Sequence, residues 1–288
     1  MVIDDDPQSR FYREGIDQGC RIVRGDLARV DDCMRAINLH ECDVVFHLGA
    51  QTIVGTALRD PLECFESNIR GTYNLLEAAR RLSPLVKAFV VASSDKAYGD
   101  SPVLPYTEDM PLNGKHPYDV SKSCTDLISQ TYAHTYGLPV SIARCGNIYG
   151  GGDLNWSRIV PGTIRSLLAG ERPVLRSDGG PIRDYIYVKD VVDAYIALAD
   201  APRRDGIEGE AFNFSPQSRY TVMDIVVALG RVMNVEPNPL VLATATMEIR
   251  DQTLDATKAR EQLGWKPQWS LDEGLRETVA WYTTYLTP

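Results

Sequence analysis

Basic residues are scarce in this 288-residue chain. Its 30 lysines and arginines are outnumbered by 39 aspartates and glutamates, and the formal net charge at pH 7 is −9. Because proteins that bind nucleic acids or anionic membranes usually carry a basic face, this balance argues against both kinds of partner. No apolar run approaches the roughly 18 residues of a membrane span, and the first residues do not resemble a signal peptide. We therefore expect a globular, cytoplasmic protein whose core is built from the 44% of residues that are hydrophobic.

Cysteine and histidine are also few, and neither is spaced to bind a metal. The six cysteines are Cys20, Cys33, Cys42, Cys64, Cys124 and Cys145. They form no C-x-x-C pair, and the four histidines show no metal-ligand spacing. His47 lies within an apolar run, where a histidine of the core or of a cofactor edge is expected. We expect reduced thiols, mostly buried, and no metal site.

A glycine-rich turn between a first strand and a first helix is missing near the N-terminus. Such a turn is the usual phosphate site of a dinucleotide-binding sheet. Gly15, Gly19 and Gly25 have the wrong spacing for it. The run Val2-Ile3-Asp4 is typical of the end of a second strand, whose acid would meet a ribose hydroxyl. The pattern predicts that the chain begins about one βα unit late, short of about 35 residues.

What is present is a regular alternation of strands and helices in the first half of the chain. Short apolar runs rich in β-branched residues predict strands, and apolar residues at three- and four-residue spacing predict helices. The expected strands are Arg21 to Val23, Asp43 to Leu48, Val86 to Ala92 and Val140 to Arg144; the expected helices are Val30 to Ile37, Pro61 to Leu82 and Pro117 to Thr135. This order predicts an α/β fold with a Rossmann-like, doubly wound parallel sheet whose first βα unit is missing.

After residue 149 the pattern loosens into glycine, proline and arginine clusters, which predict a smaller, loop-rich C-terminal lobe. Helices are expected again at Val188 to Ala199, Thr221 to Met233 and Leu271 to Tyr285, and a strand at Ala211 to Phe214. We expect residues 1–149 to form a nucleotide-binding domain and residues 150–288 to form mainly a substrate lobe. The segment 182–216 is expected to return to the first domain.

The most informative pattern is a tyrosine and a lysine four residues apart, Tyr118 and Lys122. On a helix these residues share a face, so the lysine ammonium would favour the ionised form of the phenol. Ser94 and Asp95 emerge at the carboxyl end of the strand expected at 86–92, where open α/β sheets bind ligands. The serine hydroxyl can hold a substrate oxygen, and the aspartate adds a carboxylate that hydride transfer alone does not need. The pattern predicts a catalytic centre with more than redox chemistry.

Six ordered segments give the chain a resemblance to a known family. They are Arg24-Gly25-Asp26-Leu27, Phe46-His47-Leu48-Gly49-Ala50-Gln51, Ser94-Asp95-Lys96-Ala97-Tyr98-Gly99, Tyr118 to Lys122, Arg144-Cys145-Gly146-Asn147-Ile148-Tyr149-Gly150 and Arg183-Asp184-Tyr185-Ile186-Tyr187-Val188. With them the chain resembles the extended short-chain dehydrogenase/reductase superfamily, and within it the NAD-dependent nucleotide-sugar epimerase/dehydratase family, closest to the CDP-glucose 4,6-dehydratase type. The resemblance implies NAD as cofactor, a nucleotide sugar as substrate, and a homodimer through the helices expected at 61–82 and 118–135.

The resemblance also assigns residues to the cofactor and to the substrate. For NAD it implies Asp26 and Leu27 beside the adenine, Leu48, Gly49, Ala50 and Gln51 along the groove, and Tyr118 and Lys122 at the substrate and nicotinamide ribose. For the nucleotide sugar it implies Asn147, Arg183, Asn213 and, from a weaker local match, Arg250. Arginine suits a diphosphate because its planar donors reach two oxygens together. Arg158 and Arg176 are added from local charge alone.

The same resemblance implies an internal redox cycle on the sugar. Tyr118 takes the C4 hydroxyl proton as hydride passes to NAD⁺, and Asp95 protonates the C6 hydroxyl as water leaves across C5 and C6, before hydride returns to C6. Related dTDP-glucose enzymes carry a glutamate, used as the C5 base, where this chain has Lys96. The lysine is therefore either the C5 base, which needs a depressed pKa, or a cation that holds the enolate. The expected catalytic residues are Ser94, Asp95, Lys96, Tyr118 and Lys122.

Simpler interpretations compete with this one. A 4-epimerase would share the fold, NAD, Tyr118 and Lys122 without needing an acid at Asp95. A non-catalytic remnant is the other alternative, because loss of the first βα unit removes backbone donors that normally bind the pyrophosphate. Asn68 is expected to bridge backbone groups and not to react. Arg183 either binds phosphate or pairs with a nearby acid.

Overall fold

The first helix in the described part of the chain is α1 (Arg10–Arg13). The computed structural model describes residues 6–201, 206–245 and 249–287. The run Val2-Ile3-Asp4, expected to end a strand, lies outside the described residues. Within the described ranges, no helix combines the length and the apolar character needed to cross a lipid bilayer.

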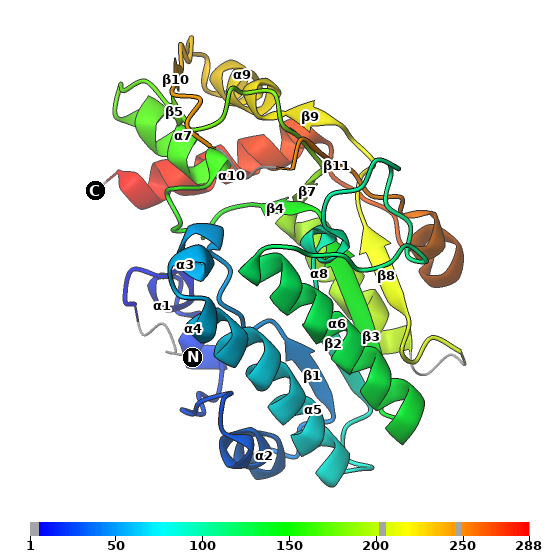
Figure 1. The fold of residues 1–288 in the computed structure, drawn as a ribbon. Helices are drawn as coiled ribbons and strands as arrows, with labels where there is room; N and C mark the ends of the chain where they lie inside the picture. The colour runs from blue at the N-terminus through cyan, green and yellow to red at the C-terminus, as the bar shows by residue number, and fades with distance from the viewer. Residues whose placement is uncertain (1–5, 202–205, 246–248, 288) are drawn as a thin grey trace.

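A four-stranded parallel sheet forms the framework of the fold (Figure 1). Its strands are β1 (Val44–His47), β2 (Ala88–Ala92), β3 (Val140–Cys145) and β8 (Ala211–Phe214), in the order β1-β2-β3-β8. Each neighbouring pair is parallel. Every residue of β3 is buried, as expected for a parallel strand that is covered on both faces.

Helices cover both faces of this sheet (Figure 1). One face packs against α5 (Gly71–Arg81) and α6 (Pro117–Tyr136), with α2 (Val30–Leu39) beside α5; the other packs against α8 (Val188–Asp200). Successive side chains of a strand point to opposite faces, so Phe89 and Val91 join the core beneath α5 and α6, whereas Val90 joins the core beneath α8. The predicted doubly wound α/β sheet is confirmed.

The helix expected over Pro61 to Leu82 is interrupted by a wider turn. It consists of α4 (Pro61–Phe65), a π-helical turn (Glu66–Arg70) and α5. Asp60 caps the start of α4, because its side chain accepts a hydrogen bond from the Glu63 backbone N–H. Helix α6 has a proline at its first position and ends at Gly137, whose φ of 67° is the left-handed conformation of a helix C-terminus.

One expectation was wrong near the N-terminus. The segment Arg21 to Val23 is not a strand but part of a loop. A strand is held by a hydrogen-bond ladder to a neighbour, and in the described part of the chain β1 is the edge strand and no strand pairs with this segment. Cys20 is exposed, whereas Cys33, Cys64 and Cys145 are buried.

The remaining elements form a C-terminal lobe (Figure 1). Its helices are α7 (Ile159–Leu168), α9 (Val222–Met233) and α10 (Leu271–Leu286). Its short strands are β4 (Asn147–Tyr149) with β7 (Tyr185–Tyr187), β5 (Val174–Leu175) with β10 (Leu240–Val241), and β6 (Ile182–Arg183) between β9 (Tyr220–Thr221) and β11 (Asp251–Gln252). A core that includes Tyr149, Ile164, Leu229 and Tyr282 joins these helices to β4 and β7.

Short helical segments complete the chain. They are α3 (Val54–Arg59), the 3-10 turns Ile16–Gly19 and Asp95–Tyr98, and the π-helical turn Ala259–Leu263. We propose residues 1–149 and 150–288 as the two domains. Within the segment 182–216, β8 is a strand of the central sheet and α8 packs against one face of that sheet. Strand β6 of the same segment pairs with strands of the lobe.

Candidate active site

A cavity of about 1090 Å³ lies between the central sheet and the C-terminal lobe. From the sheet side it is lined by residues that include Leu48, Ala50, residues 92–96, Tyr118 and Lys122, and from the lobe side by residues that include Asn147, Trp156, Arg158, Arg176 and Arg183. The sheet-side residues follow the carboxyl ends of β1 and β2, where open α/β sheets bind ligands. All five residues predicted to be catalytic therefore line one cavity.

The 3-10 turn after β2 holds three of these residues. Ser94 caps the turn: its hydroxyl accepts a hydrogen bond from the Lys96 backbone N–H at 3.2 Å and donates one to Asp95 Oδ1 at 3.0 Å. The Asp95 side chain is buried, and its second oxygen, Oδ2, has no hydrogen-bond partner among the described residues. Burial raises the pKa of the Asp95 carboxyl above its usual value, although the Lys96 ammonium opposes this. A carboxyl group in such a place tends to keep its proton.

Tyr118 and Lys122 lie one turn apart at the start of α6. The Lys122 Nζ atom is 6.0 Å from the centre of the Tyr118 ring and donates a hydrogen bond to the Ala92 carbonyl at 2.7 Å. That bond fixes the ammonium at the carboxyl end of β2. Burial lowers the pKa of Lys122 to about 8.

The effect of Lys122 on the ionisation of Tyr118 stays a prediction, and other groups dominate the pKa of the phenol in this structure. Burial, followed by the carboxylate of Asp95, raises the pKa of the Tyr118 phenol above its usual value. Arg158 and a hydrogen bond with Ser94 act in the opposite direction and do not outweigh it. Sequence spacing brings the lysine near the tyrosine, but it says nothing about the cost of burying a phenolate.

The buried Lys122 predicts a pH dependence of stability. Its pKa is about 8 in the folded protein against 10.5 for the free group, so between these values the unfolded chain binds one more proton. The free energy of unfolding should therefore rise with pH across this window, by roughly 3 kcal/mol for this group. Urea titrations at several pH values should show this rise in the wild type and lose it in Lys122→Met. The exposed Lys115→Met is the control, and an unchanged slope in Lys122→Met would contradict the assignment.

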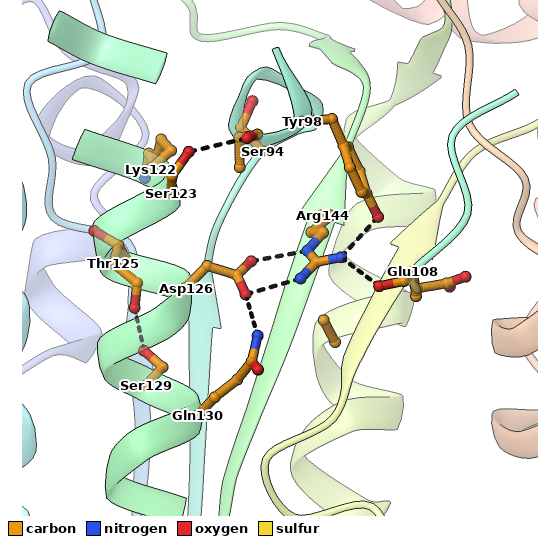
Figure 2. A network of polar contacts seen from close by, with 12 residues as sticks. Ser94, Tyr98, Glu108, Lys122, Ser123, Thr125, Asp126, Ser129, Gln130 and Arg144 are labelled. Atoms are coloured by element: carbon orange, nitrogen blue, oxygen red, sulfur yellow. Dashed lines mark hydrogen bonds and ion pairs between the residues drawn. The ribbon is translucent and has the colours of Figure 1, made fainter. Parts of the chain in front are cut away.

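A buried polar network connects α6 to the turn Asp95–Tyr98, the two elements that hold the predicted catalytic residues (Figure 2). The guanidinium of Arg144 on β3 makes two hydrogen bonds to Asp126, at 2.8 and 2.9 Å. It also donates to the Tyr98 hydroxyl at 2.8 Å and to the Glu108 carbonyl at 3.1 Å. Asp126 belongs to α6, the helix of the predicted tyrosine and lysine, and Tyr98 ends the turn Asp95–Tyr98. Arg144 therefore fixes these two elements relative to each other.

Breaking this network should destabilise the fold strongly. Asp126 and Arg144 are both buried, so Asp126→Asn leaves an uncompensated guanidinium and should lower the free energy of unfolding by about 3 kcal/mol. The matched control is Asp272→Asn, because Asp272 pairs with Arg231 on the surface and its loss should cost less than about 1 kcal/mol. Urea denaturation of both variants measures the difference. Equal losses in the free energy of unfolding would show that the buried pair stabilises the fold no more than the surface pair does.

Asn68 connects the helical layer to the loop that follows β1. It lies in the π-helical turn, where its Oδ1 accepts from the Gln51 backbone N–H at 2.7 Å and its Nδ2 donates to the Gln51 carbonyl at 3.0 Å. The Nδ2 group also donates to Ser121 Oγ at 2.8 Å. The expectation that Asn68 bridges backbone groups is confirmed. This clamp fixes the backbone of the loop 48–51, from which Leu48 and Ala50 reach the cavity.

The other predicted cofactor residues lie outside the cavity lining. Gly49 and Gln51 belong to the loop 48–51, and they alternate with Leu48 and Ala50, which line the cavity. Asp26 and Leu27 lie near α2 and α5: Asp26 Oδ1 accepts from the Ala28 backbone N–H at 2.9 Å, and the Leu27 carbonyl accepts from Asn74 at 2.9 Å. Their place beside an adenine stays a prediction.

The four predicted substrate residues divide into two pairs. Asn147 on β4 and Arg183 on β6 line the cavity. Asn213 does not: it is fully buried, its Oδ1 accepts from the Tyr98 hydroxyl, and its Nδ2 donates to the Tyr106 carbonyl. Arg250 is exposed and forms a 2.8 Å ion pair with Asp178. Neither Asn213 nor Arg250 lines the cavity, and their contacts with substrate stay predictions.

Several residues around the site had not been predicted. Asp184 is fully buried, accepts a hydrogen bond from Ser215, and has a pKa raised to about 7 by burial. Gln252 on β11 accepts a hydrogen bond from the Lys96 ammonium. Arg144 could have been noticed from sequence, since a charged residue inside an otherwise apolar strand requires a buried partner. No sequence signal connects Gln252 to the turn of Lys96.

Comparisons with known proteins agree with this architecture. The profile of the family described as GDP-mannose 4,6 dehydratase matches residues 8–278. The CDP-glucose 4,6-dehydratase of Salmonella typhimurium is 28% identical over 283 aligned residues, covering 91% of this chain and 76% of the relative. The UDP-glucose 4-epimerase of Mycolicibacterium smegmatis is 33% identical over 242 residues, covering 83% and 76%. The crystal structure of a dTDP-glucose 4,6-dehydratase from Streptomyces venezuelae with NAD bound has a TM-score of 0.83 at 28% identity, covering 92% of this chain and 80% of that one.

The relatives include both dehydratases and an epimerase, so what they share is the family and not one reaction. The family profile spans most of the chain, and the fold matches the solved structure. The chain therefore belongs to the nucleotide-sugar 4,6-dehydratase and 4-epimerase family of the extended short-chain dehydrogenase/reductase superfamily.

Proposed function

We propose that this chain uses NAD to dehydrate a nucleotide-activated hexose, with CDP-glucose as the first candidate, to its 4-keto-6-deoxy product. The observation that carries the proposal is Asp95, a carboxyl group that is only 2% exposed at the cavity of Tyr118. Burial raises the pKa of this carboxyl, and a raised pKa suits a general acid. Expulsion of a sugar hydroxyl requires such an acid, whereas inversion at C4 does not.

The sheet side of the cavity fits a nicotinamide dinucleotide. Leu48 and Val54 line it with 56% and 41% of their surfaces exposed, and apolar surface of this kind suits a flat ring. Lys122 would hold the nicotinamide ribose, Tyr118 would contact the substrate beside it, and Leu48 and Ala50 would border the groove. When bound, NAD supplies an acceptor for the C4 hydride and a donor of the same hydride to C6.

The residues of the chain carry the proton transfers. Tyr118, as the phenolate, accepts the C4 hydroxyl proton as the C4 ketone forms, and this ketone acidifies the C5–H bond. Lys96, as the neutral amine, removes the C5 proton, while Asp95 gives its proton to the C6 hydroxyl. That hydroxyl leaves as water and a C5–C6 double bond forms. After C6 has been reduced, the Lys96 ammonium returns a proton to C5, solvent reprotonates Asp95, and Tyr118 releases its proton to solvent.

The lobe side supplies groups for the nucleotide diphosphate. Arg158, Arg176 and Arg183 line the cavity, and guanidinium groups bind phosphate oxygens through paired donors. Asn147 lies on the same side and would contact the sugar. These arginines provide local positive charge for the diphosphate in a protein whose net charge is −9.

A 4-epimerase is the second candidate. It is favoured by the 33% identity to a UDP-glucose 4-epimerase and by the shared use of Tyr118 and Lys122. In that reaction Asp95 and Lys96 would have no proton to transfer. The product therefore distinguishes the two reactions directly.

The test is to incubate the chain with NAD and CDP-glucose and to follow the substrate by mass spectrometry and NMR. Loss of one water from the sugar supports the dehydratase, and unchanged mass with inverted C4 supports the epimerase. UDP-, dTDP- and GDP-activated hexoses are compared in the same assay, which identifies the base of the nucleotide that the chain accepts. Failure to convert any of them, together with failure to bind NAD, would overturn the proposal.

We also propose a homodimer in which α6 and the helices α4 and α5 form the contact. Leu127 on α6 and Leu62 on α4 leave 53% and 67% of their surfaces exposed. Apolar groups on the surface of adjacent helices suit an interface between two copies. Sedimentation velocity measures the oligomeric state, and a monomer at all concentrations would contradict this proposal.

A further inference from the structure

A residue from the far end of the chain contacts the catalytic turn. The Lys96 ammonium donates a hydrogen bond to Oε1 of Gln252, which lies 156 positions later in the sequence. The Gln252 side chain is fully buried. The two residues that follow fix this segment: the Thr253 carbonyl accepts from the Tyr106 backbone at 2.8 Å, and Leu254 packs against Tyr98 of the turn.

Strand pairing places Gln252 beside an arginine of the cavity. In the parallel pair of β6 and β11, Gln252 is in register with Arg183. Side chains in register on neighbouring strands point to the same face of a sheet. Arg183 and Lys96 both line the cavity. The small sheet of the lobe therefore brings one charged and one neutral side chain to the turn that holds the predicted acid and base.

Packing alone does not account for this glutamine. The other buried amides near the site use both ends: Asn68 and Asn213 each accept through Oδ1 and donate through Nδ2. Gln252 accepts from Lys96, but its Nε2 group is buried with no partner in the described part of the chain. A buried donor without a partner destabilises a fold, and such groups persist where they serve function.

We propose that Gln252 is a positioning residue for Lys96, which holds the amine at the cavity through a neutral acceptor and so lets it exchange the C5 proton. This inference rests on the proposed dehydratase function, because it gives Lys96 the role of the base. A carboxylate at the same position would favour the charged form of Lys96. The charged groups that act on this turn include Asp95 from the turn itself, Asp119 from α6, Arg183 from β6 and the adjacent Asp184.

The first test measures the proton affinity of Lys96 without using activity. Lys96 is acetylated with acetic anhydride at a series of pH values, and its labelling is followed by peptide mass spectrometry in wild type, Gln252→Glu and Gln252→Met. The half-labelling pH of Lys96 should rise by about one unit or more in Gln252→Glu and fall in Gln252→Met. Gln262→Glu makes the same chemical change on the exposed π-helical turn and should leave the curve unchanged. Identical curves in all proteins would overturn the inference.

The second test measures dehydration by the same variants. Gln252→Glu should lower kcat about tenfold at neutral pH, with KM unchanged and activity regained at higher pH, because one unit of proton affinity is a tenfold change in the neutral amine. Lower kcat with an unshifted pH profile would mean a structural role and would overturn the inference. The half-labelling pH of Lys96 can differ among the three proteins as predicted while no sugar nucleotide loses water. In that case the positioning of Lys96 by Gln252 stands and the proposed function fails.

Discussion

Replacing Tyr118 with phenylalanine should lower kcat for the nucleotide sugar by about 10²–10⁴-fold. The change removes only the hydroxyl that accepts the C4 proton and keeps the ring that lines the cavity. Without that group the proposed base for the oxidation is lost, so both the dehydratase and the epimerase reaction should stop at the first step. Single-turnover assays that follow NADH absorbance measure this step directly.

The binding of NAD separates a chemical effect from a structural one in this variant. Tyr118→Phe should still bind NAD within about threefold of the wild type, because the Lys122 ammonium remains fixed by the Ala92 carbonyl. Tyr136→Phe removes a hydroxyl from an exposed position of the same helix and serves as the control. If Tyr118→Phe turned over at the wild-type rate, the catalytic assignment of this tyrosine would be wrong.

Replacing Asp95 with asparagine should separate the oxidation from the loss of water. An amide of the same shape cannot protonate the C6 hydroxyl, so dehydration should fall by about 10²–10⁴-fold. Oxidation at C4 does not use this carboxyl, and NADH should therefore form and accumulate on the variant. Rapid-quench mass spectrometry for the water loss and absorbance for NADH measure the two steps side by side.

The exposed Asp100 provides a matched control for Asp95, because it lies just after the same turn. Asp100→Asn should leave both steps unchanged. A variant Asp95→Asn that dehydrates normally would remove the support for the dehydratase. Normal inversion at C4 by the same variant would establish the epimerase instead.

The sheet could be predicted from the sequence because each strand is a short, continuous apolar run. The run expected at 86–92 is β2 (Ala88–Ala92), and the run expected at 140–144 is β3 (Val140–Cys145). The same reasoning failed for residues 21–23, since a strand depends on a neighbour that local sequence does not contain. The Tyr118 and Lys122 pair was found because helical spacing is local.

The rest of the site depends on contacts that spacing cannot supply. Gln252 meets Lys96 only because β11 pairs with β6 in the folded lobe. Asp126 meets Arg144 because α6 packs on β3, an arrangement fixed by tertiary structure. The raised pKa of Tyr118 follows from burial, which a sequence motif does not report.

The π-helical turn Glu66–Arg70 keeps a long row of side chains in phase with the sheet. Cys64, Asn68, Thr72 and Leu76 are spaced by four, and all are buried. In a regular α-helix each step of four residues overshoots one turn by about 40°, so the last residue of this row would point about 120° away from the first. A wider turn absorbs part of that rotation. Deleting one residue here should rotate α4 relative to α5 and withdraw Asn68 from the Gln51 backbone.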